Sequence, residues 1–184
     1  MYLEIEHKYV VDESFDRQAF EELAKSMGPV NHYHVEVSDT YFLARSAPHH
    51  VFRHRKDRLI EELTVKSIGH KDNERRFEVN LPIKGAESGS VEAFLTPLGV
   101  FWKGNLKKNV YVYEFPTIEV VYYEAESAAA KIRCVEVEAI GFNDSDAALA
   151  EIARVEKHFG LDVGSREKKS LLQLLFPEVV LAGS

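Results

Sequence analysis

Ionisable residues occupy alternate positions at the start of the chain. Glu4, Glu6 and Lys8 are separated by Ile5 and His7 in the stretch EIEHK. Side chains two residues apart in a β-strand point to the same face, so a strand here would group two carboxylates and an ammonium. For this stretch alone a solvated face is the simpler interpretation, because charged side chains are almost always exposed.

The same alternation recurs in four later segments. In each of them, charged residues lie two or four positions apart, so that they share one face of a strand. These further charged positions are Arg53 and Arg55, Glu62 and Lys66, Glu74, Arg76 and Glu78, and Glu136 and Glu138. If the charged faces converge inside a closed barrel, they line a charged interior. Charges there must pair with one another, with a metal or with a ligand, because an unpaired buried charge costs several kcal/mol.

The two signs of charge suit different ligands. Carboxylates bind a hard divalent cation, and the candidates are Glu4, Glu6, Glu136 and Glu138. Arginine and lysine bind phosphate oxygens, and arginine can do so through two parallel hydrogen bonds. The candidates for this role are Arg53, Arg55, Lys66, Arg76, Lys108 and Lys169. A basic clamp beside an acidic metal site is the arrangement that phosphoryl transfer requires.

The hydrophobic pattern predicts the elements that must position these side chains. Alternation of strand-forming residues predicts about eight strands, over residues 2–11, 31–43, 51–57, 60–67, 73–81, 107–115, 117–124 and 131–142. Amphipathic spacing and capping residues predict helices over residues 12–28, 88–100, 143–160 and 165–176. We expect Asp12 or Ser14 to cap the first helix and Ser88 or Ser90 to cap the second. The order of elements indicates an α+β protein.

Length and composition favour one globular domain over residues 1–184, since 45% of the residues are hydrophobic and 29% are charged. A net charge of −7 argues against a nucleic-acid-binding surface built on bulk positive charge. The single Cys134 excludes a disulfide within the chain. We find no signal peptide and no apolar run of the roughly 18 residues that a membrane span needs, so we expect a cytoplasmic protein without membrane contact.

Taken in order, the charged segments resemble those of the CYTH superfamily, also called the triphosphate tunnel metalloenzymes, which includes class IV adenylate cyclases and thiamine triphosphatases. EIEHK is similar to the ExExK opening of that family, which is a weak signal by itself. Seven further matches follow in the family's order: DTYF (39–42), FRHR (52–55), LTVK (63–66), RFE (76–78), PLGV (97–100) with Lys108 after it, VEVE (135–138) and KSLLQLL (169–175). Together they are a strong signal for family and fold.

The resemblance implies an eight-stranded antiparallel β-barrel with flanking helices, a tunnel that binds a small-molecule triphosphate with Mg2+ or Mn2+. It also implies metal-dependent hydrolysis of tripolyphosphate, thiamine triphosphate or a nucleoside triphosphate. The implied metal ligands are Glu4, Glu6, Glu78, Glu136 and Glu138. The implied phosphate ligands are Lys8, Arg53, Arg55, Lys66, Arg76, Lys108 and Lys169. The implied catalytic residues are Glu4, Glu6 and Lys8.

The sequence departs from the family pattern at three places. Val110 stands where a second basic residue usually follows the lysine, and Leu171 stands where a tyrosine is common. The carboxylate that usually precedes the late glutamate pair could be Glu119, Glu124 or Glu126. Two alternatives therefore stay open, a class IV type adenylate cyclase that makes cyclic AMP from ATP and a non-catalytic module that binds polyphosphate or nucleotides. Fold alone does not decide among them.

Aromatic residues cluster in and before the later strands. Phe101 and Trp102 are expected to pack around the middle helix. Tyrosines of two neighbouring predicted strands could line the barrel wall or form the seam of a homodimer, and both interpretations stay open. These tyrosines are Tyr111, Tyr113, Tyr122 and Tyr123.

Overall fold

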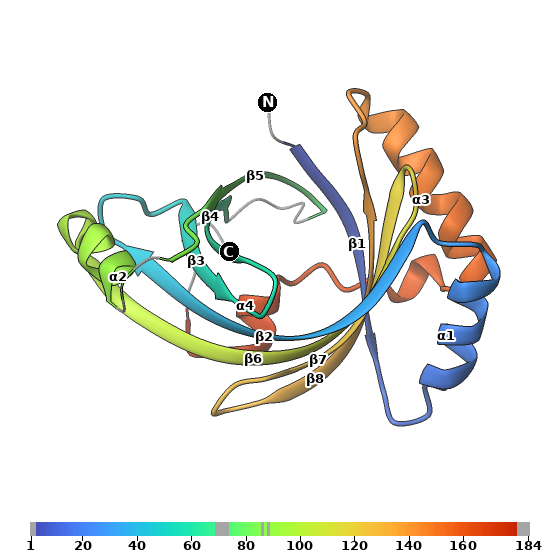
Figure 1. Cartoon of the computed structure of the whole chain (residues 1–184), viewed down its shortest axis with the longest axis horizontal. Coiled ribbons are helices and arrows are strands. Elements are labelled where there is room, and N and C mark those ends of the chain that lie inside the picture. The colour runs from blue at the N-terminus through green and yellow to red at the C-terminus, as the bar shows by residue number, and fades with distance from the viewer. Residues whose placement is uncertain (1–2, 69–73, 86, 88, 180–184) are drawn as a thin grey trace.

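The computed structural model describes residues 3–68, 74–85, 87 and 89–179. In this part of the chain, eight antiparallel strands close into a barrel in the order β1-β5-β4-β3-β2-β6-β7-β8 (Figure 1). The strands are β1 Leu3–Val11, β2 Asn31–Ala44, β3 His50–Lys56, β4 Glu61–Ser67, β5 Arg75–Pro82, β6 Val100–Glu114, β7 Ile118–Glu126 and β8 Lys131–Ala139. The predicted α+β barrel with flanking helices is confirmed.

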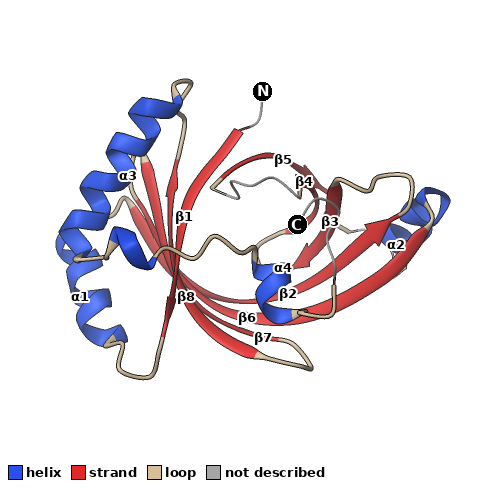
Figure 2. Cartoon of the chain, turned by 180° about the vertical axis from the view of Figure 1, so that it is seen from behind, coloured by secondary structure: helices blue, strands red, loops and turns tan. Residues whose placement is uncertain are grey.

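The helices lie in three places around the barrel (Figure 2). α1 (Arg17–Ser26) and α3 (Ser145–Phe159) lie side by side at one end, next to β1 and β8. α2 (Ser90–Leu95) and the 3-10 helix η1 (Thr96–Leu98) lie at the far end of the long strands, whereas α4 (Leu171–Leu175) follows the 3-10 helix η2 (Val163–Ser165) and packs into the barrel. None of the described helices is long and apolar enough to span a membrane.

Buried apolar side chains form separate cores on the two faces of the barrel wall. On the outer face, Phe20 of α1 and Ile152 of α3 pack with Tyr122 of the sheet. On the inner face, Leu172 of α4 packs with a group of valines that includes Val110. The wall is therefore held from outside by α1 and α3 and from inside by α4, and part of the interior stays open.

Alternation along β1 assigns its two faces. Ile5 and Tyr9 belong to the core under α1 and α3, whereas Glu4, Glu6 and Lys8 point into the barrel. Because successive strand residues face opposite sides, burying Ile5 and Tyr9 outside forces the three ionisable residues inside. The convergence of charged faces that the sequence predicted therefore occurs.

The first helix begins later than predicted. α1 starts at Arg17 and is capped by Asp16, whose side chain accepts a hydrogen bond from the Ala19 amide at 3.0 Å. Asp12 and Ser14 instead form a turn in which Asp12 Oδ1 accepts from the Ser14 amide at 2.8 Å. The predicted cap was wrong because several residues able to cap a helix follow one another here, and a local turn engages the first of them.

The second helix also lacks the predicted cap. The residue before α2 is Gly89, which has a φ of 83° and offers no side-chain hydrogen bond, and Ser90 is already helical. Glycine adopts this left-handed conformation without strain, so the chain turns into the helix through its backbone alone. Ser88 lies outside the described residues. The helix is shorter than the predicted range of 88–100, because it ends at Leu95 and Pro97 lies in η1 immediately after it.

β6 begins at Val100 rather than at Lys107, and it pairs with β2 along its length. Phe101 and Trp102 therefore belong to this strand and not to the surroundings of α2; Trp102 packs edge-on against Phe176. Gly104 hid the strand from sequence reasoning, because glycine weakens strand propensity. Its position requires glycine, because a Cβ there would lie 2.3 Å from a ring carbon of Trp102.

Two boundaries near the C-terminus also differ from prediction. β8 ends at Ala139 instead of residue 142, and the last α-helix covers only Leu171–Leu175 instead of 165–176. Ser170 caps α4 and forms a capping box with Gln173. The helix starts late because Ser170 satisfies its first free amides, which leaves the preceding segment extended against β1.

The clustered tyrosines lie within the chain's own wall. Tyr113 and Tyr122 are buried in the core beneath α1 and α3, and Tyr123 is buried on the inner face. Tyr111 is half-buried with the Arg17 guanidinium 4.7 Å from its ring centroid. These positions correspond to the barrel-wall interpretation, and the homodimer stays a prediction.

Candidate functional site

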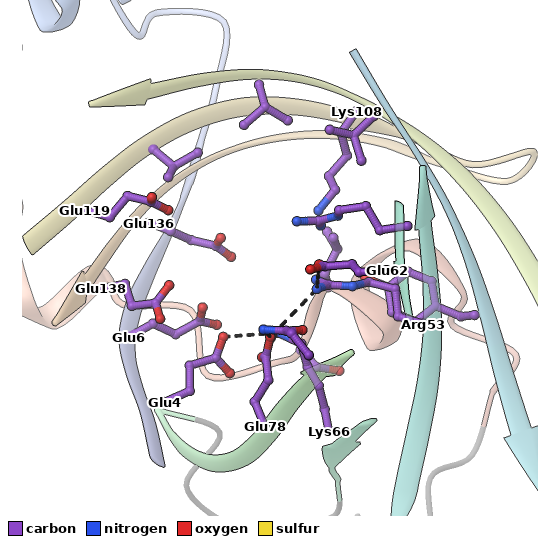
Figure 3. Close-up of a pocket in the computed structure, with 18 of the residues that line it drawn as sticks. Glu4, Glu6, Arg53, Glu62, Lys66, Glu78, Lys108, Glu119, Glu136 and Glu138 are labelled. Atoms are coloured by element: carbon purple, nitrogen blue, oxygen red, sulfur yellow. Dashed lines mark hydrogen bonds and ion pairs between the residues drawn. The ribbon is translucent and has the colours of Figure 1, made fainter. Parts of the chain in front are cut away.

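A cavity of about 310 Å³ lies inside the barrel and is lined largely by the ionisable residues that alternate along the strands. Carboxylates of Glu119, Glu136, Glu138 and Glu6 lie along one side, and Lys108 and Arg53 lie across from them (Figure 3). The predicted site residues that line it are Glu4, Glu6, Lys8, Arg53, Arg55, Lys66, Arg76, Glu78, Lys108, Glu136 and Glu138. The closed barrel thus brings together groups from six strands.

Glu4, Glu6 and Glu138 form a compact acidic group. One carboxylate oxygen from each lies within 4.8 Å of the others. Burial, together with the charges of Glu4 and Glu6, raises the pKa of Glu138 well above its usual range. Burial also raises the pKa of Glu6, in spite of the nearby Arg76 charge. Three crowded carboxylates fit a hard divalent cation, because oxygen ligands at this spacing are what Mg2+ or Mn2+ binds and the cation would remove their repulsion.

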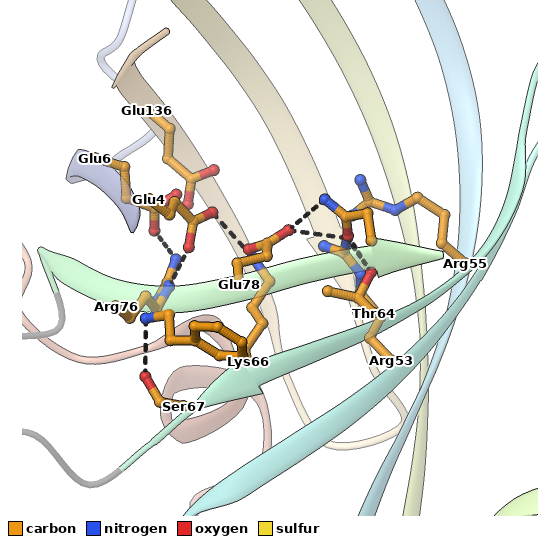
Figure 4. A network of polar contacts seen from close by, with 12 residues as sticks. Glu4, Glu6, Arg53, Arg55, Thr64, Lys66, Ser67, Arg76, Glu78 and Glu136 are labelled. Carbon is orange, nitrogen blue, oxygen red and sulfur yellow. Dashed lines mark hydrogen bonds and ion pairs between the residues drawn. The ribbon is translucent and has the colours of Figure 1, made fainter. Parts of the chain in front are cut away.

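Arg76 and Lys66 hold the edge of the acidic group (Figure 4). Arg76 donates to both Glu4 and Glu6, and Lys66 Nζ lies 3.0 Å from Glu4 Oε1 and forms an ion pair with Glu78. Burial alone would raise the pKa of Glu4, but the Lys66 and Arg76 charges hold it well below its usual range. The neighbouring cations therefore favour the ionised form of Glu4.

Lys8 and Glu136 form a second ion pair on adjacent strands. Lys8 Nζ lies 3.2 Å from Glu136 Oε1 and 3.6 Å from Glu6 Oε1. Burial opposes the charged form of Lys8, but the Glu136 and Glu6 charges outweigh it and raise the pKa of Lys8. The structure therefore places Glu136 and Glu78, two of the predicted metal ligands, beside lysines rather than within the three-carboxylate group.

Asp39 organises the cations on the opposite side. Its carboxylate accepts two hydrogen bonds of 2.9 Å from Arg55 and lies 3.1 Å from Lys108 Nζ. Burial would raise the pKa of Asp39, but the Lys108 and Arg55 charges lower it strongly. Burial and the neighbouring Arg55 charge lower the pKa of Lys108 to about 8. Next to this group, Arg53 donates to Glu62 at 3.1 Å and to Thr64 at 2.8 Å.

A family model described as the CYTH domain matches residues 2–171 of the chain. This chain belongs to the CYTH family. The family predicted from the order of the charged motifs is confirmed, and the closed barrel described above is its tunnel.

Solved structures resemble the CYTH barrel over most of its length. The PH1012 protein from Pyrococcus horikoshii OT3 is 23% identical with a TM-score of 0.74, and the alignment covers 94% of this chain and 99% of that one. A conserved hypothetical protein from Pyrococcus furiosus is 25% identical with a TM-score of 0.73 and the same coverage. HpAC1 from Hippeastrum, a proposed adenylyl cyclase described as having a dominant triphosphatase activity, is 12% identical with a TM-score of 0.58, covering 98% of each chain. A comparison with curated protein sequences finds no match.

Of the three acidic residues that could take the position before the late glutamate pair, the structure shows which one faces the CYTH tunnel. Of the three candidates, Glu119 lines the cavity and lies opposite Glu138 in the β7–β8 ladder. Glu124 and Glu126 have the other parity along β7, so they point outward. Burial raises the pKa of Glu119 to about 7, and the Glu114 and Glu136 charges contribute.

Lys169 is the one predicted phosphate ligand that the CYTH structure does not bring to this cavity. Its side chain is exposed and absent from the cavity lining, although the next three residues, Ser170, Leu171 and Leu172, line it. Val110 also lines the cavity, so two of the three departures from the family pattern, Val110 and Leu171, give this tunnel apolar surface in place of a polar side chain.

Sequence reasoning missed two residues that organise the site. Asp39 belongs to the DTYF motif and lies at alternate positions with Val35 and Val37. The alternation along this strand could therefore have placed its side chain on the inward face. Glu62 was counted only as part of a charged face, and its bond to Arg53 follows from the register of β3 against β4. Asp39 was overlooked because the other residues on its face of the strand, such as Val35, Val37 and Tyr41, are uncharged.

Proposed function

We propose that this protein hydrolyses the terminal phosphoryl group of a small-molecule triphosphate in a divalent-metal-dependent reaction inside the barrel. The observation that carries the proposal is the cavity inside the barrel, with carboxylates along one side and arginine and lysine side chains across from them (Figure 3). A triphosphate needs both, because cations bind its oxygens and a metal ion neutralises its remaining charge. The proposal takes the whole chain, residues 1–184, as the single functional domain.

The cations of the cavity would bind the phosphate oxygens. Arg53, Arg55 and Lys108 come from β3 and β6, whereas Lys8, Lys66 and Arg76 lie beside the acidic residues Glu136 and Glu4. Each of these six is paired with a carboxylate in the ligand-free protein, so the phosphates would replace those carboxylates as partners. Arginine adds a planar fork that matches phosphate oxygens in pairs. Lys169 is left out of this set because its side chain lies outside the cavity.

Glu4, Glu6 and Glu138 would hold the divalent cation, Mg2+ or Mn2+, with Glu136 next to them. When bound, the metal supplies charge neutralisation and polarisation of a phosphoryl oxygen. Lys8 would keep Glu136 and Glu6 in place through its two ion pairs. Glu119, on the same side of the cavity, would accept the proton of the attacking water, since a carboxyl group with a pKa near 7 is suited to proton transfer at neutral pH.

Glu6→Gln tests the proposal directly. Removing one carboxylate charge from the three-carboxylate group should lower phosphate release by at least about 100-fold, a loss typical of removing one preorganised electrostatic group from an active site. The assay measures phosphate released from tripolyphosphate, thiamine triphosphate and ATP in the presence of Mg2+ or Mn2+. Glu36→Gln is the matched control, because Glu36 lies on the same barrel with its side chain exposed outside the cavity.

Two outcomes would contradict the proposal. Wild-type protein that turns over none of the three triphosphates would favour a binding module, and an unchanged rate in the Glu6→Gln variant would remove the metal-ligand assignment. The same ATP assay separates hydrolysis from cyclisation, since cyclisation yields cyclic AMP and pyrophosphate whereas hydrolysis yields ADP and phosphate. The resemblance to HpAC1, with both activities in its description, makes this product analysis part of the test.

A further inference from the structure

One end of the cavity is lined by two exposed aliphatic side chains and a tyrosine, and Asp57 of the same hairpin is the charged residue beside them. Tyr33 of β2 lines it together with Leu59 and Ile60, which lie at the tip of the β3–β4 hairpin. Leu59 is 52% exposed and Ile60 is 43% exposed. Exposed aliphatic side chains are ordinary when single, but here two adjacent ones lie beside a tyrosine at the opening of a charged cavity.

The hairpin tip holds these side chains in a defined position. Asp57 Oδ1 accepts hydrogen bonds from the amides of Leu59 at 2.6 Å and Ile60 at 2.8 Å, and the Asp57 amide donates to the Ile60 carbonyl at 3.0 Å. Arg58 Nη2 donates to the His34 carbonyl at 2.9 Å, which ties the tip to the residue after Tyr33. The backbone thus fixes an apolar surface that the protein's own packing does not cover.

The apolar surface continues from the opening into the cavity. In the register of the sheet, Tyr33 lies opposite Val112, and Val112 lies opposite Val121. Both valines line the cavity, and Val121 lies opposite Glu136 across the next ladder. An apolar strip therefore runs across three strands from the opening to the acidic side. Inorganic tripolyphosphate carries only oxygen atoms at its surface and gains nothing from such a strip.

The basic side chains lie next to the same opening. Arg55 lies two residues before Asp57 on β3 and pairs with Glu62 in the β3–β4 register. Arg53 lies one step further along that face and donates to Glu62. A molecule with its phosphates among these arginines would have its other end at Tyr33, Leu59 and Ile60.

We propose that this end of the cavity binds the flat aromatic or heteroaromatic group of an organic triphosphate, and that organic triphosphates are the preferred substrate class. The inference rests on the proposed function for its phosphate site. Tyr33 would stack on the ring, and Leu59 and Ile60 would cover its edge. Binding such a group would bury apolar surface of both the ligand and the protein. Small-molecule sites are typically lined by apolar side chains with a few polar groups that anchor the ligand.

The experiment compares three probes, ATP, thiamine triphosphate and tripolyphosphate, on wild type, Tyr33→Ala and the double variant Leu59→Ser/Ile60→Ser. We expect both variants to lower kcat/KM for the organic triphosphates by about ten-fold, since losing apolar contacts in a pocket has effects of this size. The value for tripolyphosphate should stay within about two-fold. The hairpin variants alter exposed side chains, so they should fold; Tyr33→Ala is checked by circular dichroism. The ratio of kcat/KM for ATP to kcat/KM for thiamine triphosphate shows which of the two ring types the site prefers.

Leu81→Ser is the matched control, because Leu81 is 50% exposed on β5 and does not line the cavity. Equal losses for all three probes, or no loss for any, would overturn the inference and leave the proposed function standing. No turnover of any probe by the wild type would overturn the proposed function instead. In that case calorimetry of ATP and tripolyphosphate binding replaces the rate, and weaker binding of ATP alone in the hairpin variant supports the organic-group site, whereas equal binding rejects it.

Discussion

At the scale of single residues, the cavity places every charge of its basic side against an acid. Asp39 is fully buried between Arg55 and Lys108, and its stability as a carboxylate depends on both. The charged form of Lys108 is stabilised less than that of Arg55, because Lys108 shares the Asp39 carboxylate with Arg55, which donates two hydrogen bonds to it. Burial, together with the neighbouring Arg55 charge, lowers the pKa of Lys108 to about 8 although Asp39 favours the charged form. Lys108 is therefore the cation whose charge responds to pH near neutrality.

Binding of tripolyphosphate should weaken as pH rises above about 8 in metal-free buffer. A lysine whose pKa is lowered loses its proton as pH rises through that value, so the charged fraction of Lys108 falls there. A lost charged hydrogen bond corresponds to about ten-fold in the dissociation constant. Isothermal titration calorimetry between pH 7 and 9 measures the change.

Lys108→Arg is the control for this pH dependence. Arginine stays protonated across the range, so the variant keeps only the pH dependence that belongs to the ligand and to Glu119, whose pKa is about 7. A wild-type profile that runs parallel to that of Lys108→Arg would contradict the assignment of the change to Lys108.

At the scale of elements, β1 acts as a two-sided strand that connects the cavity to the outer helices. On its outer face, His7 Nδ1 lies 2.6 Å from Glu156 Oε1 of α3, and the Tyr9 hydroxyl donates to the same oxygen at 2.5 Å. Arg166 donates to Glu156 Oε2 at 2.7 Å. On its edge, the Glu167 amide donates to the Lys8 carbonyl at 2.7 Å. Helix α3 and the segment around Arg166 and Glu167 therefore hold β1 in place, and the other face of β1 carries the candidate metal ligands Glu4 and Glu6.

Replacing Glu156 with alanine should lower the free energy of unfolding by about 3 kcal/mol, because removing one partner of a buried ionic group leaves the others unpaired. Burial opposes ionisation, but hydrogen bonds from His7, Tyr9 and Arg166 lower the pKa of Glu156. A lowered carboxyl pKa contributes stability above its ordinary value of 4.5, and this contribution is lost as pH falls through the lowered pKa. Urea denaturation at pH 7 and pH 4 measures both effects.

Arg154→Ala on the same helix is the matched control. Arg154 bonds Glu151 at 2.9 Å on the exposed side of α3, and such surface pairs contribute under about 1 kcal/mol. If the two alanine variants lose equal stability, the buried cluster does not hold β1 in the way described.

At the scale of the whole molecule, closure of the barrel forms the site and also buries the charged side chains that line it. Six cations and their carboxylate partners lie in one enclosed space, so the ligand-free protein is stabilised by internal ion pairs that a substrate must replace. The exchange is favourable when a triphosphate and a metal ion enter together, since each then neutralises the side of the cavity that carries the opposite charge.

Ligand binding should therefore raise the unfolding temperature. A ligand at 100 times its dissociation constant adds about 2.7 kcal/mol of stability, which corresponds to an increase in Tm of roughly 5–10 °C for a domain of this size. Differential scanning fluorimetry with tripolyphosphate and Mn2+ measures the shift. Sodium sulfate at the same ionic strength is the control, and an equal rise with sulfate would indicate a general salt effect.

Much of the fold and of the site was predictable because it is local. The pattern of residues around Glu4, Arg53, Lys66, Arg76 and Glu136 has a period of two, and that period alone decides which side chains share a strand face. The first part of β6 was not predictable from its own residues, because Gly104 is a poor strand former and the pairing with β2 overrides its preference.

The sequence by itself determined which charged residues share a strand face, because that depends on residue types at fixed short spacings. Its resemblance to the CYTH superfamily pointed to the family and the barrel. Only the tertiary structure decided that Glu119 and not Glu124 or Glu126 faces the cavity, that Lys169 lies outside it, and that Leu59 and Ile60 lie at its opening. These depend on strand register and on where separate elements meet when the barrel closes. Contacts of that kind join residues far apart in the chain, so no local spacing encodes them.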